Sequence, residues 1–195
     1  MEGITMSNPI LLDFPESFET ERLLIRAPQA GDGAELNEAI RESRSELLPY
    51  MPFAKNLPTV EESEIFSREG RISYLKRSSL FLRIYDKHTG AFIGCSGLHQ
   101  IDWEAGKFEI GYWVRTSCSG KGYITEAVNG IVDFAIRELA ANRLEIRCNA
   151  ANVRSAAVAE RTGFKLDGIL RKDRLENDGQ LHDTKIYAKV RGDEF

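Results

Sequence analysis

The strongest constraint on the fold is a long segment near the middle of the chain in which apolar residues recur with the period of a helix. They recur at i, i+3, i+4, i+7 and i+8, which predicts an amphipathic helix with one buried face. The apolar stripe comprises Ile124, Ala127, Val128, Ile131, Val132, Ala135, Ile136 and Leu139. The opposite side, which we expect to face water, comprises Thr125, Glu126, Asn129, Asp133 and Arg137. A helix of this kind must pack its stripe against a sheet.

Strand-like runs precede and follow this helix. The run "KFEIGYWV" over residues 107–114 alternates between two faces. One face has Phe108, Ile110, Tyr112 and Val114, and the other has Lys107, Glu109 and Trp113. The run "RLEIRCN" over residues 143–149 follows the helix directly. A strand, a turn, a helix and a strand form a crossover unit, so we predict that the two strands are parallel neighbours.

The rest of the chain predicts further strands and helices around this unit. Strands are expected at residues 20–28, 79–86 and 91–102, and in a hairpin over 165–190 that turns at Asp178-Gly179. Helices are expected at residues 30–43 with Asp32 as N-cap, at 60–77, and at 150–164, where Gly163 ends the helix. The stretch 46–59 contains three prolines and suits a loop over a pocket.

These elements predict a mixed α/β fold in which an antiparallel meander leads into one parallel crossover and a hairpin ends the chain. No internal repeat, low-complexity tract or linker divides the sequence. Residues 1–195 are therefore predicted to form a single domain.

Composition narrows the classes of function. The net charge of -4 and the pI near 5.5 lack the positive field that nonspecific nucleic-acid binding requires, so no nucleic-acid partner is expected. No apolar run approaches the ~20 residues that span a bilayer, and the start of the chain has acids where a signal peptide has bases. We therefore expect a cytoplasmic protein without a membrane partner.

The cysteines and histidines predict no metal site. Cys95, Cys118 and Cys148 lack metal-ligand spacing, and their odd number suits a reducing compartment. The histidines, His88, His99 and His182, are scattered along the chain. Cys118 lies beside a glycine-rich turn, but no histidine is near it in sequence to activate it as a nucleophile.

That turn, "SGKGYITEA" over residues 119–127, leads directly into the long helix. A helix N-terminus attracts anions through its unpaired N–H groups, and Gly120 and Gly122 allow a phosphate to approach the backbone closely. The alternative is that the glycines only make a tight entry to the helix. Neither the Walker pattern nor the dinucleotide fingerprint fits, because Gly122 follows Lys121 and no third glycine stands at Ile124 or Thr125.

Several of these stretches together resemble the GNAT N-acetyltransferase superfamily, and within it the RimJ/RimL group of protein N-terminal acetyltransferases. The resemblance begins at "TERLLIRAP" and continues almost to the end of the chain. The stretches that resemble the family are "KFEIGYWV", "SGKGYITEAV", "RLEIRCNAANVRSAAVAERTGF" and "HDTKIYA". The turn differs from the family pattern Gln/Arg-x-x-Gly-x-Gly/Ala at its first position, where this chain has Ser117.

The resemblance implies a GNAT-like domain in which two central strands splay apart and acetyl-CoA binds between them. The strand that ends near Val114 would hold the pantetheine arm, and the glycine turn would bind the pyrophosphate. Asn152 would contact pantetheine, although an asparagine here also suits an ordinary helix N-cap. The residues expected to bind the cofactor are Trp113, Val114, Gly120, Lys121, Gly122, Tyr123, Thr125 and Asn152.

For catalysis, the resemblance implies direct attack of an amine on the thioester, without a metal. Glu109 is expected to take the proton of the amine through water, and His99 is the alternative base. Ser155 is expected to protonate the coenzyme A sulfur. Each has a purely structural alternative, as a strand ion pair for Glu109, a hydrogen-bonded histidine for His99 and a first-turn serine for Ser155.

The acceptor amine is open to three interpretations. The first is the N-terminal α-amine of a protein, a ribosomal protein by resemblance. The second is a small-molecule amine, such as an antibiotic, a polyamine or an aminoacyl compound, and the third is a noncatalytic acyl-CoA-binding module. Tyr50 and Phe53 would form walls of an acceptor pocket, and the alternative is that they anchor their loop. The resemblance allows a homodimer, and the role of His182 and Asp183 stays open.

Overall fold

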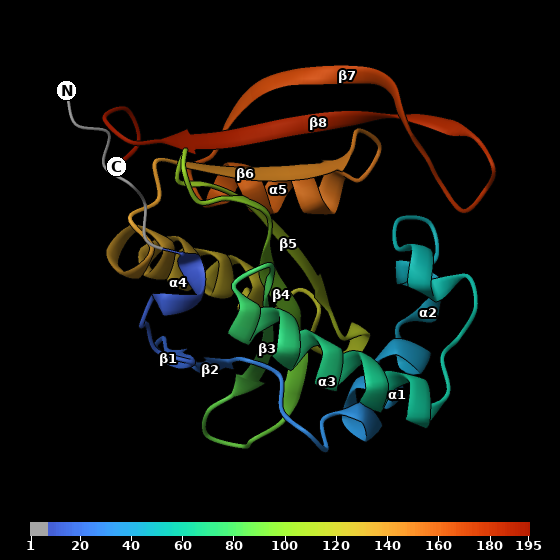
Figure 1. Cartoon of the computed structure of the whole chain (residues 1–195). Coiled ribbons are helices and arrows are strands. Elements are labelled where there is room, and N and C mark those ends of the chain that lie inside the picture. Colours follow the sequence, from blue (N-terminus) through green and yellow to red (C-terminus); the bar gives the residue numbers. More distant parts are fainter. Residues whose placement is uncertain (1–7) are drawn as a thin grey trace.

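An eight-stranded sheet organises the computed structural model, which describes residues 8–195 (Figure 1). Residues 1–7, where the sequence predicted no signal peptide, lie outside the described residues. The strands are β1 (Ser17–Glu19), β2 (Leu23–Arg26), β3 (Leu80–Asp86), β4 (Phe92–Asp102), β5 (Lys107–Val114), β6 (Arg143–Asn149), β7 (Lys165–Leu175) and β8 (Leu181–Val190). Their order in the sheet is β1-β2-β3-β4-β5-β6-β8-β7.

Five α-helices and three short 3-10 helices are found in the described part of the chain. The α-helices are α1 (Gly33–Glu42), α2 (Arg44–Leu47), α3 (Val60–Lys76), α4 (Tyr123–Glu138) and α5 (Val153–Arg161). The 3-10 helices are η1 (Pro9–Leu11), η2 (Pro52–Ala54) and η3 (Thr116–Cys118). None of the helices described is long and apolar enough to cross a bilayer.

The sheet confirms the predicted mixed α/β fold, because β5 and β6 run parallel on either side of the α4 crossover. Their pairing is short and covers Lys107↔Arg143, Phe108↔Leu144 and Glu109↔Glu145. On its other edge, β5 stays paired with β4 as far as Val114. Beyond Glu109, β5 and β6 therefore diverge, which is the splay that the resemblance implied.

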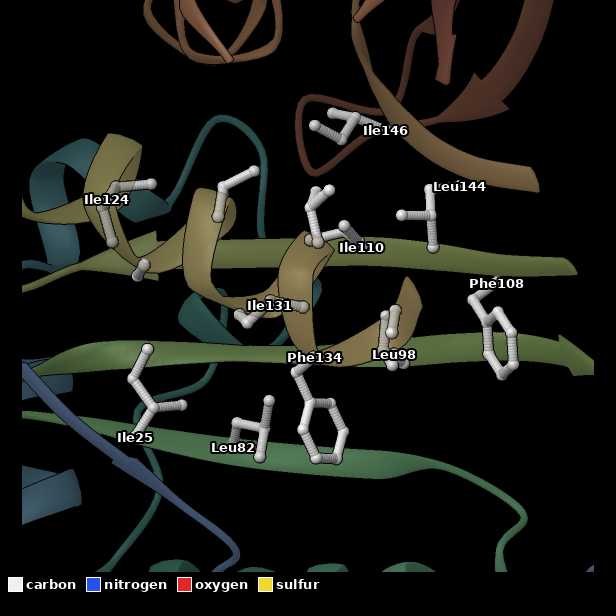
Figure 2. Packing of buried hydrophobic residues seen from close by; sticks show 14 of the residues in the cluster. Ile25, Leu82, Leu98, Phe108, Ile110, Ile124, Ile131, Phe134, Leu144 and Ile146 are labelled. Carbon is white, nitrogen blue, oxygen red and sulfur yellow. The ribbon is translucent and has the colours of Figure 1, made fainter. Parts of the chain in front are cut away.

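The predicted stripe of α4 lies in the main hydrophobic core (Figure 2). Ile124 and Ile131 face the strand residues Ile25, Leu82 and Leu98. Phe134, which lies outside the predicted stripe, is also buried and stacks on Phe18 of β1 at 4.8 Å. The prediction for Glu126 is wrong: its side chain does not face water but binds Thr20 and Arg22 near the start of β2.

A second, smaller cluster packs α1 on the opposite face of the sheet. It consists of Leu36, Ala39, Ile40, Tyr85, Phe92 and Cys95, with Trp113 packed against it. The alternation predicted for β5 is confirmed, because Phe108, Ile110, Tyr112 and Val114 pack in the main core while Trp113 contacts this second cluster.

The N-terminus of α1 is capped by a side chain of another helix rather than by the residue at its own N-cap position. Asp32 stands at the N-cap position, but its side chain makes no capping bond. It binds the Arg26 guanidinium at 2.7 and 2.9 Å instead. The carboxylate of Glu64 in α3 accepts hydrogen bonds from Gly31 N at 2.9 Å and Gly33 N at 3.0 Å. The prediction of Asp32 as a side-chain cap is therefore wrong, because a carboxylate from α3 satisfies those amides.

The stretch 46–59, predicted as a loop, contains the end of α2 and all of η2. It is held by the turn between β7 and β8, which lies beside it (Figure 1). Asn177 Nδ2 in that turn donates to the carbonyl oxygens of Leu48 at 2.7 Å and Met51 at 2.9 Å. The C-terminal hairpin thus positions a segment more than a hundred residues away in sequence.

The contact between α1 and α3 leads to a stability prediction. A Cβ added at Gly33 would lie 2.5 Å from Glu64 Cα, too close for the two backbones to stay in place. We expect Gly33→Ala to lower the free energy of unfolding by about 1–3 kcal/mol, the usual cost of overpacking. Gly168→Ala is the control, since nothing lies within 4 Å of its added Cβ. Urea unfolding measures both, and equal stability of the two variants would contradict the prediction.

Candidate active site

A cavity of about 900 Å³ opens where β5 and β6 diverge. It lies between the end of β5, the glycine turn, the first turns of α4 and α5, and the segment after α2. Residues that the sequence singled out and that line this cavity are Tyr50, Trp113, Val114, Gly120, Gly122, Tyr123, Thr125, Asn152 and Ser155. The fold therefore brings together residues from four separate parts of the chain.

The glycine turn presents its backbone to this cavity. Gly120 and Gly122 have φ of 74° and 79°, the left-handed conformation that glycine adopts without strain. Nothing lies within 4 Å of a Cβ added at Gly120, so the space beside this backbone is open. No described residue accepts a hydrogen bond from the amides of Gly120, Lys121, Gly122 or Tyr123. A helix N-terminus with free N–H groups and open space suits an anion such as a phosphate.

The residues that supply positive charge to the cavity wall differ from the one that the sequence analysis named. Lys121 is exposed and does not line the cavity, and its carbonyl oxygen accepts a hydrogen bond from Arg22. Arg154 and Arg161, which the sequence reasoning missed, line the cavity from α5. Their spacing of seven residues on a predicted helix places them on one face, and that spacing was the available signal.

Two hydroxyl groups meet in the wall of the cavity. Ser155 Oγ donates to the hydroxyl oxygen of Tyr112 at 3.1 Å, and the Tyr112 hydroxyl donates to the Ser155 carbonyl oxygen at 2.9 Å. Burial raises the pKa of Tyr112, so this phenol stays protonated. Asn152 caps α5, since its Oδ1 accepts from Ser155 N at 3.1 Å. Tyr112 was assigned from sequence only to the buried face of its strand.

The Val114 amide lies at the end of β5, which lines the cavity. Trp113 O points toward β4, since a Cβ added at Gly94 would lie 2.3 Å from it, and Arg115 N donates to Ile93 O of that same strand. Successive peptide groups of a strand point to opposite edges. The Val114 N–H therefore points away from β4, toward the splay.

Glu109 and His99 are partners across β4 and β5 on the face that also carries Trp113. Neither lines the cavity. Glu109 is the last residue of β5 that pairs with β6, so it lies at the vertex of the splay. Burial raises the pKa of Glu109, and burial lowers the pKa of His99. The fold therefore brings the two candidate bases together across adjacent strands, and neither lies in the cavity wall.

The His99 ring lies over two glycines that the sequence reasoning passed over. A Cβ added at Gly97 or at Gly111 would lie 3.2 Å from this ring. Phe81 of β3 makes an edge-to-face contact with it at 5.1 Å. Paired glycines on adjacent strands were the signal that a side chain crosses them.

Phe53, His182 and Asp183 lie apart from the cavity wall. Phe53 is 39% exposed and is absent from the lining, although its ring lies 6.1 Å from that of Trp113. His182 Nε2 lies 2.8 Å from Asp178 Oδ2, and Asp183 accepts a hydrogen bond from Lys172 N. Cys118 lines the cavity, whereas Cys95 and Cys148 are buried. Within residues 8–195, no group of three His, Cys, Asp or Glu side chains could hold a metal ion.

Two sequence comparisons match most of the chain. The family model of the acetyltransferase (GNAT) domain matches residues 22–165. The chain is 32% identical over 173 residues to the putative ribosomal N-acetyltransferase YdaF of Bacillus subtilis (strain 168), covering 88% of this chain and 92% of that protein.

Solved structures show the same fold. The Microcin C7 self immunity acetyltransferase MccE, in complex with acetyl-CoA and AMP, superimposes with a TM-score of 0.84 at 26% identity, covering 91% of this chain and 97% of that one. RimL, a ribosomal L7/L12 alpha-N-protein acetyltransferase in complex with coenzyme A, has a TM-score of 0.84 at 21% identity, covering 90% and 98%. At that identity the likeness to RimL shows the fold alone.

The burial of Glu109 predicts a pH-dependent stability. A carboxyl group whose pKa is raised on folding stabilises the protein fully below its ordinary pKa of 4.5, and this contribution is lost as the pH rises through the raised value. Glu109→Gln has no charge to bury. We therefore expect this variant to be more stable than the wild type at pH 7, with the difference gone near pH 4, as measured by urea unfolding at both pH values. Glu104→Gln at an exposed turn is the control, and a loss of stability in Glu109→Gln at pH 7 would contradict the prediction.

Proposed function

The chain belongs to the GNAT acetyltransferase family and is an acetyl-CoA-dependent N-acetyltransferase, and from this we propose that it acetylates the N-terminal α-amine of a protein, with a ribosomal protein as the acceptor. The observation that supports the proposal most is the open glycine turn at the edge of the splay cavity. The name of the relative YdaF supports a ribosomal acceptor. The proposal places the enzyme in the cytoplasm, where ribosomes and acetyl-CoA meet.

The cavity residues fit acetyl-CoA in size and chemistry. The amides from Gly120 to Tyr123 would bind the pyrophosphate, with Lys121 as an accessory charge outside the wall. Thr125 at the first turn of α4 lies beside them. The pantetheine arm would lie along Trp113 and Val114 of β5 and reach Asn152 of α5. Arg154 and Arg161 add positive charge to the same wall.

Bound acetyl-CoA supplies an activated acyl group, and the protein groups would act on the atoms around it. The Val114 N–H would donate a hydrogen bond to the thioester carbonyl oxygen, where negative charge develops. Glu109 would accept the proton that the amine loses, through a water molecule, as the N–C bond forms. Ser155 would donate a proton to sulfur as the C–S bond breaks. His99 is the alternative base, and its lowered pKa keeps its ring neutral.

An α-amine suits a site with one partly buried carboxylate. Its reference pKa is about 8, against about 10.4 for a lysine amine, so the neutral form is easier to reach near pH 7 by roughly 3 kcal/mol. Because the pKa of Glu109 is raised, it is closer to the pKa of the α-amine than that of an ordinary carboxyl group is. Tyr50, which lines the cavity, would contact the acceptor, whereas Phe53 would do so only through Trp113.

A small-molecule amine is the second candidate acceptor. The likeness to MccE, whose structure contains AMP, favours a nucleotide-bearing amine within this class.

The homodimer that the resemblance allows is also part of the proposal, and the exposed Ile169 and Leu170 on the edge strand β7 would suit such a contact.

The turn can be tested with a matched pair of glycines. Gly120 and Gly90 have φ of 74° and 71°, and neither has an atom within 4 Å of an added Cβ, so alanine strains both backbones alike. We expect Gly120→Ala to raise the KM for acetyl-CoA about tenfold, the effect of roughly one lost hydrogen bond to a charged group. Gly90→Ala should leave this KM unchanged. If the two variants have similar KM values for acetyl-CoA, the turn has only a structural role.

The acceptor can be tested with a panel of amines. N-terminal peptides of ribosomal proteins, polyamines, amino-bearing antibiotics and aminoacyl nucleotides are assayed with acetyl-CoA. We expect the highest kcat/KM with the peptides, and Glu109→Gln should lower kcat on them by about a hundredfold or more, as expected for a lost general base. Turnover of small amines alone would overturn the protein acceptor, and an unchanged kcat in Glu109→Gln would exclude Glu109 as the base.

A further inference from the structure

The segment between β1 and β2 binds the first turn of α4, although about a hundred residues separate them in sequence. Glu126 Oε1 accepts hydrogen bonds from Thr20 Oγ1 at 2.5 Å and Arg22 N at 2.7 Å. Glu126 Oε2 accepts from Arg22 Nε at 2.6 Å. The side chain of Glu126 is only 18% exposed and that of Arg22 is 38% exposed. One carboxylate therefore joins two backbone segments through three donors.

Arg22 also contacts the glycine turn itself. Its Nη1 donates to the carbonyl oxygen of Lys121 at 3.1 Å. Its guanidinium lies over the Tyr123 ring, 4.6 Å from the centroid. Its Nη2 would lie 3.5 Å from a Cβ added at Gly122. A single arginine thus contacts Lys121 and Tyr123, on either side of Gly122. Asp86 holds Tyr123 further, since it accepts a hydrogen bond from the Tyr123 hydroxyl at 3.2 Å.

The pair remains charged. Burial alone would raise the pKa of Glu126, but the hydrogen bonds from Thr20 and Arg22 lower it. The hydrogen bond to Glu126 raises the pKa of Arg22. Charge-assisted hydrogen bonds of this kind are short and strongly directional, so they hold the guanidinium in one orientation.

A turn with two left-handed glycines needs such support. Glycine has the largest backbone freedom of any residue, so ordering a glycine costs more conformational entropy than ordering any other residue. When that cost is met by contacts within the protein, less of the ligand's binding energy is lost to ordering. Arg22 bonds a carbonyl oxygen of the turn and none of its amides, so it can order the turn without occupying its anion-binding groups.

We propose that Arg22 and Glu126 are positioning residues for the coenzyme: through Lys121 and Tyr123 they hold the glycine turn in the conformation that binds the pyrophosphate. The inference rests on the proposed function of that turn. Neither Arg22 nor Glu126 lines the cavity, so both would act on the coenzyme through the turn.

The test compares two acetyl donors, acetyl-CoA and S-acetyl-N-acetylcysteamine, a short thioester without pyrophosphate. We expect Arg22→Ala and Glu126→Gln each to lower kcat/KM for acetyl-CoA about tenfold, through KM, and to leave kcat/KM for the short thioester within twofold of the wild type. The control is Arg71→Ala, which removes an ion pair to Glu16 of 2.8 Å with a similarly exposed arginine, 30%, away from the cavity. Arg71→Ala should leave kcat/KM unchanged with both acetyl donors.

Each outcome decides the proposal. Equal losses with both donors would reduce the pair to a general structural role, and an unchanged KM for acetyl-CoA would overturn it. An effect of Arg22→Ala without one of Glu126→Gln would mean that Arg22 contacts the coenzyme directly, which also overturns it. If Arg22→Ala does not fold, Arg22→Lys replaces it, since lysine keeps the charge but cannot bind Glu126 and Lys121 together. Gly120→Ala distinguishes failure of the proposed pyrophosphate site from failure of the positioning role. If this variant also lowers kcat/KM equally with both donors, the pyrophosphate assignment fails. If it is the only variant that lowers kcat/KM for acetyl-CoA more than for the short thioester, only the positioning role fails.

Discussion

The short parallel pairing of β5 and β6 creates the cavity and sets the positions of the elements around it. Three residue pairs join the strands, and the pairing stops at Glu109 because β5 stays with β4 while β6 continues along β8. The gap that opens beyond Glu109 exposes strand backbone groups that a continuous sheet would pair. The α4 crossover begins at one rim of this gap and α5 at another, so the cavity results from the way the strands separate.

Strand alternation then divides the chemistry between the two faces of the sheet. Tyr112 and Val114 pack on the face covered by α4, where Ser155 reaches the Tyr112 hydroxyl. Glu109 lies on the other face, which also carries Trp113. In the proposed reaction the thioester would lie in the splay and the amine would approach from the face of Glu109. A single strand would thus separate the two substrates and still let their reacting atoms meet at its open edge.

Much of the fold could be predicted because its signals are local. The α4 stripe, the β5 alternation and the turn at Asp178-Gly179 each depend on residues close together in sequence, and each is confirmed. The wrong predictions concern polar side chains. Asp32 has the residue type of an N-cap but binds Arg26, and Glu126 has the position of a solvated residue but binds Thr20 and Arg22. Partners far away in sequence leave no periodic signal.

The elements, their faces, the glycine turn and the family can be read from the amino-acid sequence, since these follow from periodicity, from backbone requirements and from motifs within a few residues. Which of the candidate residues share the cavity follows only from the folded chain. It placed Tyr50 and Arg161 in the wall, left Glu109 and His99 beside it, excluded Phe53, and brought Arg22 to the turn. The physical reason is that side-chain proximity across a sheet depends on strand register and on where pairing ends, which are properties of the assembled sheet rather than of any one segment.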